Sequence, residues 1–383
     1  MYLQRYLDLN QLLNQKSFFL LGPRATGKTS IIKNQLAERA FIINLLRSDD
    51  FIKLNNNPSI LEEIISALPS TKNIIVIDEV QRIPTLLNEV HRLIEEKNIR
   101  FLLTGSSARK LRKNNVNLLA GRAWEAQFFP LTRNEIPNFS INRYLQIGGL
   151  PSVYLSGNPK EELIAYTNTY LKEEIQAEAV VRKIQSFTKF LEHSAFMSGK
   201  MLNFSNLSSD LGIPASTIRE YYQVLQDTLV GFLLPAWTKT IKRKAISTAK
   251  FYFFDIGLRN QLTGIQTIEP QSDLYGQAFE HFIAMELRAC INYKRKHLPL
   301  SYWASKNGHE VDFIIGNEIA IEVKTSNSIT NKHLNGLKAL SEENICSQYF
   351  LVSFDKINRV HKKINILYWE EFLDRLWQDQ IIP

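Results

Sequence analysis

The chain has 383 residues, 44% hydrophobic and 22% charged, which is enough for two to four domains with cores of their own. Its net charge of +8 favours polyanionic partners such as nucleic acid, although charge alone identifies none. Two cysteines, Cys290 and Cys346, exclude a disulfide framework, and the absence of a signal-peptide core or an apolar run of about 18 residues predicts a cytoplasmic protein without membrane contact.

Short apolar runs alternate with helix-length segments in the first third of the chain. Runs of this kind are typical of an α/β domain whose mostly parallel sheet is buried on both faces. We expect strands at residues 17–21, 41–45, 74–77 and 100–103.

The alternation stops near residues 147–151, and residues 160–235 carry apolar side chains at helical spacing. A basic stretch then leads into a small β-element within residues 237–254. Beyond it, a helix from Gln277 precedes a second set of strands, which we expect at residues 311–315, 319–323 and 349–352.

Residues 22–29, GPRATGKT, match the P-loop pattern G-x-x-x-x-G-K-[ST] between a strand and a helix. In this motif backbone N–H groups and the helix N-terminus bind phosphates, Lys28 reaches the β- and γ-phosphates, and Thr29 ligates Mg²⁺. The sequence thus predicts an ATP site. The residues expected to contact the nucleotide are Gly22, Pro23, Arg24, Ala25, Thr26, Gly27, Lys28, Thr29 and Ser30.

The apolar run at residues 74–77 ends in Asp78 and Glu79. A carboxylate at the end of a buried strand would ligate Mg²⁺ beside Thr29, which assigns Asp78 to the metal. Glu79 is suited to orient or deprotonate the attacking water. A strand that ends in acids by chance is the alternative, and the P-loop upstream argues against it.

A third strand, residues 100–103, ends in hydroxyl residues. In ATPases with an extra strand between the two Walker strands, a polar residue here senses the γ-phosphate, so Thr104 or Ser106 is a candidate. Capping of a strand–helix turn explains these hydroxyls equally well. Arg122 is either an arginine finger that contacts ATP, which in trans would require a homo-oligomer, or a surface charge.

Several stretches together resemble the prokaryotic AAA-type ATPases that carry a C-terminal domain of unknown function. They are GPRATGKT, VIDEVQRIP, LLTGSSARKL, LAGRAWE, FPLTRNE, GGLPSVYL, HEVDFII and IAIEVKTS, and they run from Gly22 to Ser326. Residues 149–151 are also similar to the Gly-x-Pro motif of signal-transduction and replication-initiator ATPases, where it marks the nucleotide-contacting lid.

The resemblance implies an α/β chain with an AAA-type P-loop ATPase core, a helical lid, a winged helix and an α/β nuclease-like domain. On this basis we expect the core at residues 1–138, the lid at 139–195, the winged helix at 196–260 and the nuclease-like domain at 261–383.

Residues 206–219 indicate a helix-turn-helix with Gly212 in the turn. Ile213, Ile218 and Leu225 form its expected buried face. The second helix is the one that enters the major groove when such a motif binds DNA, and its expected exposed residues are Ser216, Thr217, Arg219, Glu220 and Gln223.

A basic stretch follows this motif and fits a wing that contacts phosphates. Its residues are Lys239, Lys242, Arg243, Lys244 and Lys250. Packing against the chain's own ATPase core, binding of a partner protein, or a solvated basic hairpin would explain the same residues.

Residues 311–324 indicate a β-hairpin that brings Asp312, Glu322 and Lys324 together, because alternate strand residues share a face. This set resembles the PD-(D/E)xK nuclease core, with Val311 in place of its proline. The resemblance implies that Asp312, Glu322 and Glu280 of the preceding helix hold Mg²⁺ or Mn²⁺. Lys324 would polarise the attacking water. A structural Glu322–Lys324 ion pair is the alternative.

Three functions remain open. The first is an ATPase that couples its nucleotide state to nucleic-acid binding, DNA in preference to RNA, with metal-dependent cleavage as a possible output. The second is a regulatory switch ATPase that binds protein partners and carries a non-catalytic nuclease-like domain. The third is a nuclease gated by ATP.

Overall fold

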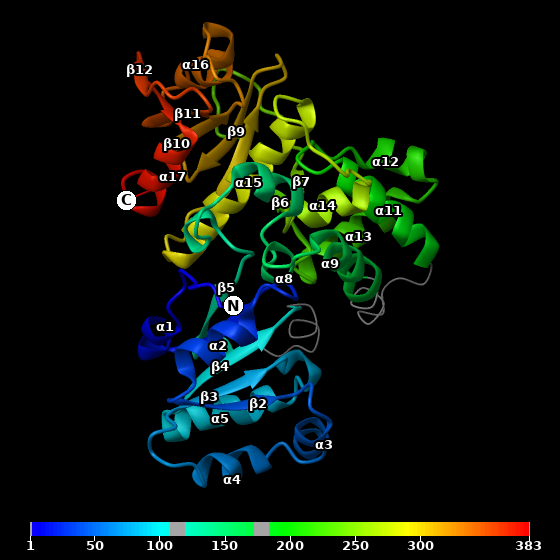
Figure 1. Cartoon of the computed structure of the whole chain (residues 1–383), viewed down its shortest axis with the longest axis vertical. Helices are drawn as coiled ribbons and strands as arrows, with labels where there is room; N and C mark the ends of the chain where they lie inside the picture. Colours follow the sequence, from blue (N-terminus) through cyan, green and yellow to red (C-terminus); the bar gives the residue numbers. More distant parts are fainter. Residues whose placement is uncertain (1, 108–118, 172–183, 383) are drawn as a thin grey trace.

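The computed structural model describes residues 2–107, 119–171 and 184–382. The last residues of the LLTGSSARKL stretch and part of the expected helical lid lie outside this range. Figure 1 shows an N-terminal α/β unit at one end, a C-terminal α/β unit at the other, and helices of the middle region beside them. Among the described residues no helix is both long and apolar enough to cross a membrane.

The N-terminal unit is a parallel five-stranded sheet of order β2-β3-β4-β1-β5 with helices on both faces. Strands β1, β3 and β4 are buried almost throughout, as their continuous apolar runs predict. Strand β4 lies between β1 and β3, as in ATPases with an extra strand between the Walker strands. The strands are β1 (Ser17–Leu21), β2 (Ala40–Asn44), β3 (Ile74–Asp78), β4 (Arg100–Gly105) and β5 (Ala123–Gln127).

Strand β5 was not expected from the sequence. It is the edge strand beside β1, and the side chains of Trp124 and Glu125 are exposed. An edge strand that is half solvated carries no continuous apolar run, so the local pattern is weak. The helices of this unit are α1 (Leu9–Gln15), α2 (Lys28–Leu36), α3 (Ser48–Asn56), α4 (Ile60–Ser66) and α5 (Leu86–Lys97).

The middle region is mainly helical, as predicted, but the helical stretch expected at residues 160–235 ends earlier than predicted. Residues Gly231–Leu234 form strand β6, which pairs antiparallel with β7 (Lys250–Phe253). Leu229 has φ 60, a left-handed conformation that ends the preceding helix. The helices are α7 (Ile141–Ile147), α8 (Pro151–Tyr154), α9 (Pro159–Ala165), α11 (Ile184–Phe196), α12 (Phe204–Leu211), α13 (Ala215–Asp227) and α14 (Ile256–Thr263).

The segment expected to be a helix-turn-helix forms α12 and α13. Gly212 joins them with φ 63, a conformation that favours glycine. Ile213, Ile218 and Leu225 are buried, and Arg219 and the other polar residues of α13 face outward or are half-buried. Asn203 caps α12 by accepting from the backbone N–H groups of the first turn.

The C-terminal unit is a six-stranded mixed sheet of order β12-β13-β11-β10-β9-β8. The predicted hairpin is correct: β9 (Glu310–Ile315) and β10 (Ile319–Val323) pair antiparallel, and β10 pairs parallel with β11 (Gln348–Ser353). The remaining elements are α15 (Asp273–Tyr293), β8 (Leu300–Ala304), α16 (Asn335–Ser341), β12 (Arg359–His361), β13 (Ile364–Tyr368) and α17 (Trp369–Trp377).

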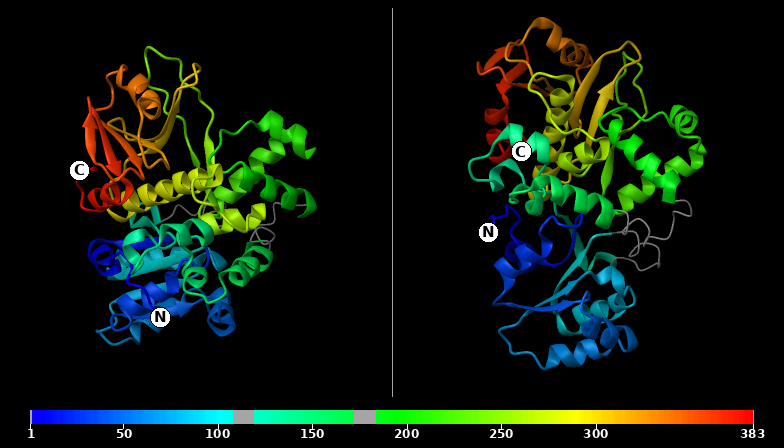
Figure 2. Two further views of the ribbon diagram at one scale, coloured as in Figure 1. Left: turned by 45° about the horizontal axis from the view of Figure 1, so that its top comes forward. Right: turned by 45° about the vertical axis from the view of Figure 1, so that its right-hand side comes forward.

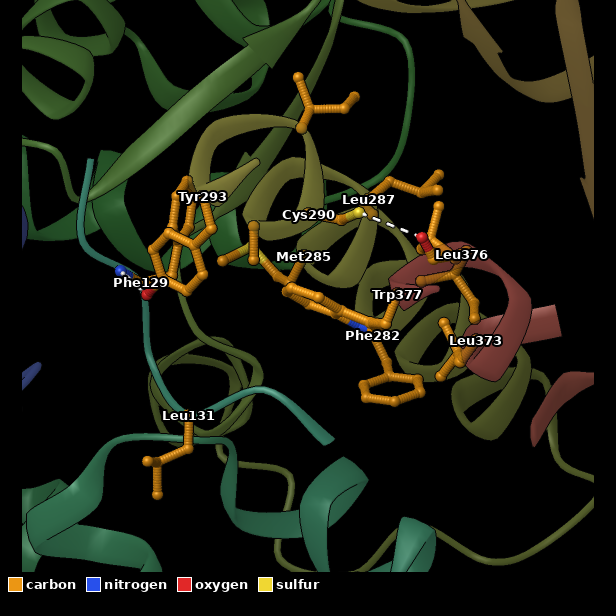
Figure 3. Packing of buried hydrophobic residues seen from close by; sticks show 14 of the residues in the cluster. Phe129, Leu131, Phe282, Met285, Leu287, Cys290, Tyr293, Leu373, Leu376 and Trp377 are labelled. Carbon is orange, nitrogen blue, oxygen red and sulfur yellow. Dashed lines mark hydrogen bonds between the residues drawn. The ribbon is translucent and has the colours of Figure 1, made fainter. Parts of the chain in front are cut away.

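Helix α15 joins the two α/β units. It crosses the molecule between them in the left view of Figure 2, where it is yellow. One continuous cluster of buried apolar side chains includes residues of β1, α15 and α17. Figure 3 shows Phe129 and Leu131 of the N-terminal unit on one side of α15, with Leu376 and Trp377 of α17 on the other. The two units therefore share a core rather than meeting across a polar interface.

The basic stretch predicted to be a free wing lies against the C-terminal unit instead. We call residues 235–248 the strap. The backbone N–H of Trp237 donates to Tyr302 O at 2.6 Å, and that of Ile246 donates to Ala304 O at 2.8 Å, so the strap follows the edge of β8.

Two acids at the end of α16 hold the strap. Glu343 accepts from the backbone N–H groups of Ile241 and Lys242 at 2.9 and 2.8 Å, and Arg243 pairs with both Glu342 and Glu343. The Arg243 guanidinium is thus taken up by carboxylates of the chain itself. Lys242 donates to Glu342 O, and Lys239, Lys242 and Lys244 are exposed.

Candidate functional site

The P-loop opens into a cleft of about 700 Å³ between the N-terminal sheet and the middle region. Gly27 has φ 94 and directly precedes α2, so backbone N–H groups at the start of this helix face the cleft. Gly22 lies so close to Phe128 O that a Cβ atom would be only 2.5 Å from it, which explains the need for glycine there. The predicted residues that line the cleft are Arg24, Ala25, Gly27, Lys28, Thr29, Ser30 and Glu79.

Three predicted P-loop residues support the loop and do not line this cleft. Gly22 and Pro23 line a neighbouring cavity. Thr26 is fully buried and donates its hydroxyl to Pro23 O at 2.8 Å. The ammonium of Lys28 donates to the carbonyls of Gly22 and Pro23 at 2.7 and 2.9 Å, so it is held over the loop that would bind the phosphates.

Arg5 supports the P-loop from behind, a role that the sequence did not indicate. Its guanidinium is buried and donates to Thr26 O and Phe129 O, both at 2.7 Å, and it pairs with Glu135 at 3.1 Å. A buried charge of this kind is tolerated because a carboxylate pairs with it and carbonyl oxygens accept its hydrogen bonds. Only the folded chain brings residues 5, 26 and 135 together.

The two Walker residues predicted to hold Mg²⁺ meet at the end of β3. The Thr29 hydroxyl donates to one carboxylate oxygen of Asp78 at 3.1 Å. Thr104 on β4 donates to the other carboxylate oxygen, and its own oxygen accepts from the Glu79 N–H at 3.1 Å. A hydroxyl and a carboxylate side by side match the oxygen donors that Mg²⁺ prefers.

Glu79 follows the strand with φ 61, which turns its side chain into the cleft. One of its carboxylate oxygens accepts from Ser106 at 3.2 Å and also from Gln81. Gln81 additionally donates to Ser106 at 3.2 Å. Thr104 and Ser106, the two sensor candidates, therefore contact different acids. Gln81, two residues beyond Glu79, was not singled out in the sequence.

The middle region closes the cleft opposite the P-loop. Pro151, of the motif at residues 149–151, lines it together with Ser152, Glu162 and Tyr166. Asp255, which follows β7, accepts from the Gly149 N–H at 2.8 Å and caps α14 by accepting from the Leu258 N–H at 3.0 Å.

Arg122 requires a correction as a nucleotide contact within its own chain. It precedes β5, whose first residue pairs with Ser17 at the start of β1, whereas the P-loop follows the other end of β1. Its guanidinium pairs with Glu95 of α5 at 2.6 Å. Parallel strands keep their amino ends together, so Arg122 lies at the edge of the sheet away from the cleft.

The predicted acids of the C-terminal unit also come together. Asp312 on β9 accepts from the Val323 N–H on β10 at 2.8 Å, and Glu322 pairs with Lys324 at 2.5 Å. Asp312 and Glu322 are both buried. Glu280 approaches from α15, and its charge acts on Lys324. These four residues thus share one end of the β9–β10 hairpin.

Three further residues, not predicted for this place, complete the group. Lys250 of β7 pairs with Glu310 of β9 at 2.6 Å and with Glu280 at 3.3 Å. Tyr252 donates its hydroxyl to Glu280. The sequence placed Lys250 in a basic wing and gave no role to Glu310, because the two are distant in the chain. We call Glu280, Glu310, Asp312 and Glu322 the carboxylate cluster.

Burial and neighbouring charges shift the pKa values of Glu280, Glu322 and Lys250. Burial raises the pKa of Glu322 well above its usual value, and Asp312 raises it further, while Lys324 opposes both effects. Burial alone would lower the pKa of Lys250, but Glu280 and its neighbours raise it well above the usual range. Perturbed ionisable groups of this kind gather at functional sites and also in structural ion-pair networks.

The donor chemistry of the carboxylate cluster fits a hard divalent cation. One oxygen of Glu322, Oε2, is buried without a hydrogen-bond partner. Within the described residues, however, no three histidine, cysteine or acidic side chains are arranged to hold a metal together. Glu280 and Glu310 point instead at the ammonium of Lys250.

Comparison with known proteins identifies the N-terminal unit. Residues 14–137 match a family model described as an AAA domain. Residues 138–269 and 275–372 match models described as domains of unknown function, DUF8612 and DUF4143 respectively. These matches agree with the parallel sheet and P-loop of the first unit.

Two relatives that align with most of this chain are uncharacterised proteins. The chain is similar to an uncharacterised protein of Mycobacterium tuberculosis, 25% identical over 320 residues, which cover 81% of this chain and 70% of that protein. It is also similar to an uncharacterised protein of Methanocaldococcus jannaschii, 23% identical over 409 residues, which cover 96% and 86%. Along the chain, the matches are thus an AAA domain followed by two domains of unknown function.

Proposed function

We propose that this protein is an ATP-hydrolysing switch whose nucleotide state controls action on nucleic acid. The nucleotide cleft carries the proposal, because Lys28, the Thr29–Asp78 pair and Glu79 all converge on it. The AAA domain match over residues 14–137 supports the same activity.

The P-loop, Asp78 and Glu79 would each have a part in hydrolysis. N–H groups of the P-loop and Lys28 bind and orient the β- and γ-phosphates. Thr29 and Asp78 would hold Mg²⁺, which neutralises charge on the phosphates. Glu79 orients the attacking water and accepts its proton, and Ser106 and Gln81 position Glu79 through one of its oxygens.

The C-terminal unit would be the part that acts on nucleic acid. Asp312, Glu322 and Lys324 meet at one end of the β9–β10 hairpin, which supports a PD-(D/E)xK nuclease-like centre. Asp312, Glu322 and Glu280 would hold Mg²⁺ or Mn²⁺, and Lys324 would stabilise the charge that develops on the phosphate.

Helices α12 and α13, followed by the β6–β7 pair, support the winged helix. Because the strap is packed on the C-terminal unit, contact with DNA would fall to the outer face of α13, where Ser216, Arg219 and Gln223 are exposed.

A regulatory switch ATPase that binds protein partners is the second candidate. The inward-facing charges of Arg243 and Lys250 favour it, since they leave fewer basic groups for phosphates. Nucleic-acid binding that weakens steeply with added salt supports the first proposal, whereas salt-insensitive capture of a protein supports the second.

The test is cleavage of labelled DNA and RNA with Mg²⁺ or Mn²⁺, with and without ATP, alongside ATP hydrolysis. Lys28→Ala should abolish hydrolysis, while Lys33→Ala, on the exposed side of the same helix, should not. Cleavage lost in Asp312→Ala would establish the metal-dependent activity. Hydrolysis without cleavage under any condition would favour the switch that binds protein partners.

A further inference from the structure

Lys250 is a cation placed inside the carboxylate cluster by another part of the chain. The four carboxylates come from α15, β9 and β10 of the C-terminal unit, whereas Lys250 begins β7 of the middle region. Its side chain is only 4% exposed and pairs with Glu310 at 2.6 Å and Glu280 at 3.3 Å. Its ammonium also lies over the Tyr302 ring, 5.1 Å from the centroid.

A buried lysine needs this degree of compensation, because an ammonium removed from water is costly unless carboxylates surround it. The reverse also holds, since the acids of the cluster repel one another unless a cation lies among them. Lys250 therefore offsets the mutual repulsion of the carboxylates, as a bound metal cation would.

A divalent cation at the proposed site would share Glu280 with Lys250, whose ammonium contacts the Glu280 carboxylate at 3.3 Å. Mg²⁺ and Mn²⁺ take carboxylate oxygens at close to 2 Å, far closer than an ammonium approaches, so the metal and Lys250 compete for this carboxylate. Glu322 Oε2 is buried and has no hydrogen-bond partner, so the cluster holds one further oxygen, bonded to neither Lys250 nor Lys324, that could ligate a metal.

We propose that Lys250 is a built-in plug of the carboxylate cluster, and that a divalent cation binds there only when Lys250 is displaced. The inference rests on the proposed metal site of the C-terminal unit and adds the group that controls it. The middle region thereby holds the C-terminal site in a closed form.

The position of Lys250 also indicates what could displace it. Strand β7 starts at Lys250 and ends at Phe253, and Asp255 just beyond it holds Gly149 of the loop that lines the nucleotide cleft. A shift of that loop by a nucleotide would act on the strand that carries the plug.

The test measures Mn²⁺ binding to the full chain by electron paramagnetic resonance. Lys250→Met keeps the length of the side chain and removes its charge, and we expect its Mn²⁺ dissociation constant to fall at least about tenfold. Lys242→Met removes a charge from the strap and serves as the matched control, with no change expected. Adding Asp312→Asn to Lys250→Met should abolish the gain in Mn²⁺ affinity.

A folded Lys250→Met protein that binds Mn²⁺ no better than wild type overturns the plug. If this variant does not fold, lysine labelling of wild type decides the matter. Lys250 should be protected from an amine-reactive reagent in the free protein and should react at saturating Mn²⁺. Protection that persists at saturation also overturns the plug.

Different experimental results would contradict the proposed plug and the proposed nuclease activity. If Lys250→Met binds Mn²⁺ more tightly but no variant cleaves nucleic acid, the plug is supported and the nuclease activity is contradicted. Cleavage by wild type together with equal Mn²⁺ affinity in both proteins keeps the nuclease and removes the plug.

Discussion

Single side chains in the nucleotide cleft are held by neighbours that come from different strands. Thr104 of β4 binds Asp78 and the backbone of Glu79, while Ser106, just after β4, binds the Glu79 carboxylate. Because β4 lies directly beside β3, the two acids and the two hydroxyls face one another across a single strand spacing. The position of Glu79 therefore depends on β4 as much as on its own strand.

Glu286, on α15, is a buried acid between the two α/β units. It accepts from the Arg133 N–H and from the Trp377 indole, both at 2.8 Å. Burial raises its pKa from 4.5 to about 7; the two hydrogen bonds and the charge of Arg133 oppose this effect, and Glu135 adds to it.

This pKa predicts a pH-dependent stability. An acid with a raised pKa in the folded state stabilises the fold fully below its unfolded pKa, and that stability is lost as the pH rises through about 7. Between about pH 5 and pH 8, the free energy of unfolding of wild type should fall by about 2 kcal/mol relative to Glu286→Gln.

Urea unfolding of both proteins at the two pH values measures this difference. Glu371→Gln, which changes a half-buried acid of α17 that pairs with Arg375, should follow wild type. Parallel pH profiles of wild type and Glu286→Gln would contradict the prediction.

At the scale of elements, the strap shows how a segment without helix or strand can be held in place. The Glu343 side chain is fully buried and binds two N–H groups of the strap and the guanidinium of Arg243. Each hydrogen bond to a buried charge contributes on the order of 2 kcal/mol, so Glu343 is expected to stabilise the strap substantially.

Glu343→Ala should therefore release the strap. We expect trypsin to cleave after Lys242, Arg243 or Lys244 at least about tenfold faster in this variant, because local opening precedes cleavage. Mass spectrometry of timed digests would locate the cuts. Glu371→Ala is the matched control, and an unchanged rate at these sites would show that the contacts along β8 suffice.

At the scale of the whole molecule, Asp255 connects the nucleotide cleft with the carboxylate cluster. It holds Gly149 beside the cleft and lies two residues beyond β7, which carries Lys250 at its other end. The shortest path along the chain between the two sites is strand β7.

Asp255→Asn should weaken this connection, since an amide can accept through only one of the two positions that now face N–H groups. With a non-hydrolysable ATP analogue, hydrogen exchange at residues 250–253 should change at least about twofold in wild type and much less in the variant. Asp210→Asn, an exposed acid of α12, provides the isosteric control. Equal responses in all three proteins would show that Asp255 transmits nothing.

Local rules were sufficient for the features that the sequence predicted correctly. The P-loop, the acids after β3 and the β9–β10 hairpin depend on residues close together in the chain, where apolar runs and strand alternation determine conformation. Lys28, Thr29 and Glu79 line one cleft, and Glu322 shares a strand face with Lys324, as such patterns predict. The ion pair between Glu322 and Lys324 is the alternative that the sequence left open.

The tertiary structure alone decided the rest. The place of Arg122 follows from the pairing of β5 with β1, and the contacts of Lys250 and Arg243 follow from the packing of the middle region on the C-terminal unit. A basic residue has the same local pattern whether it faces solvent or a distant carboxylate. The burial that distinguishes the two is a sum of many long-range contacts, which no short window of sequence contains.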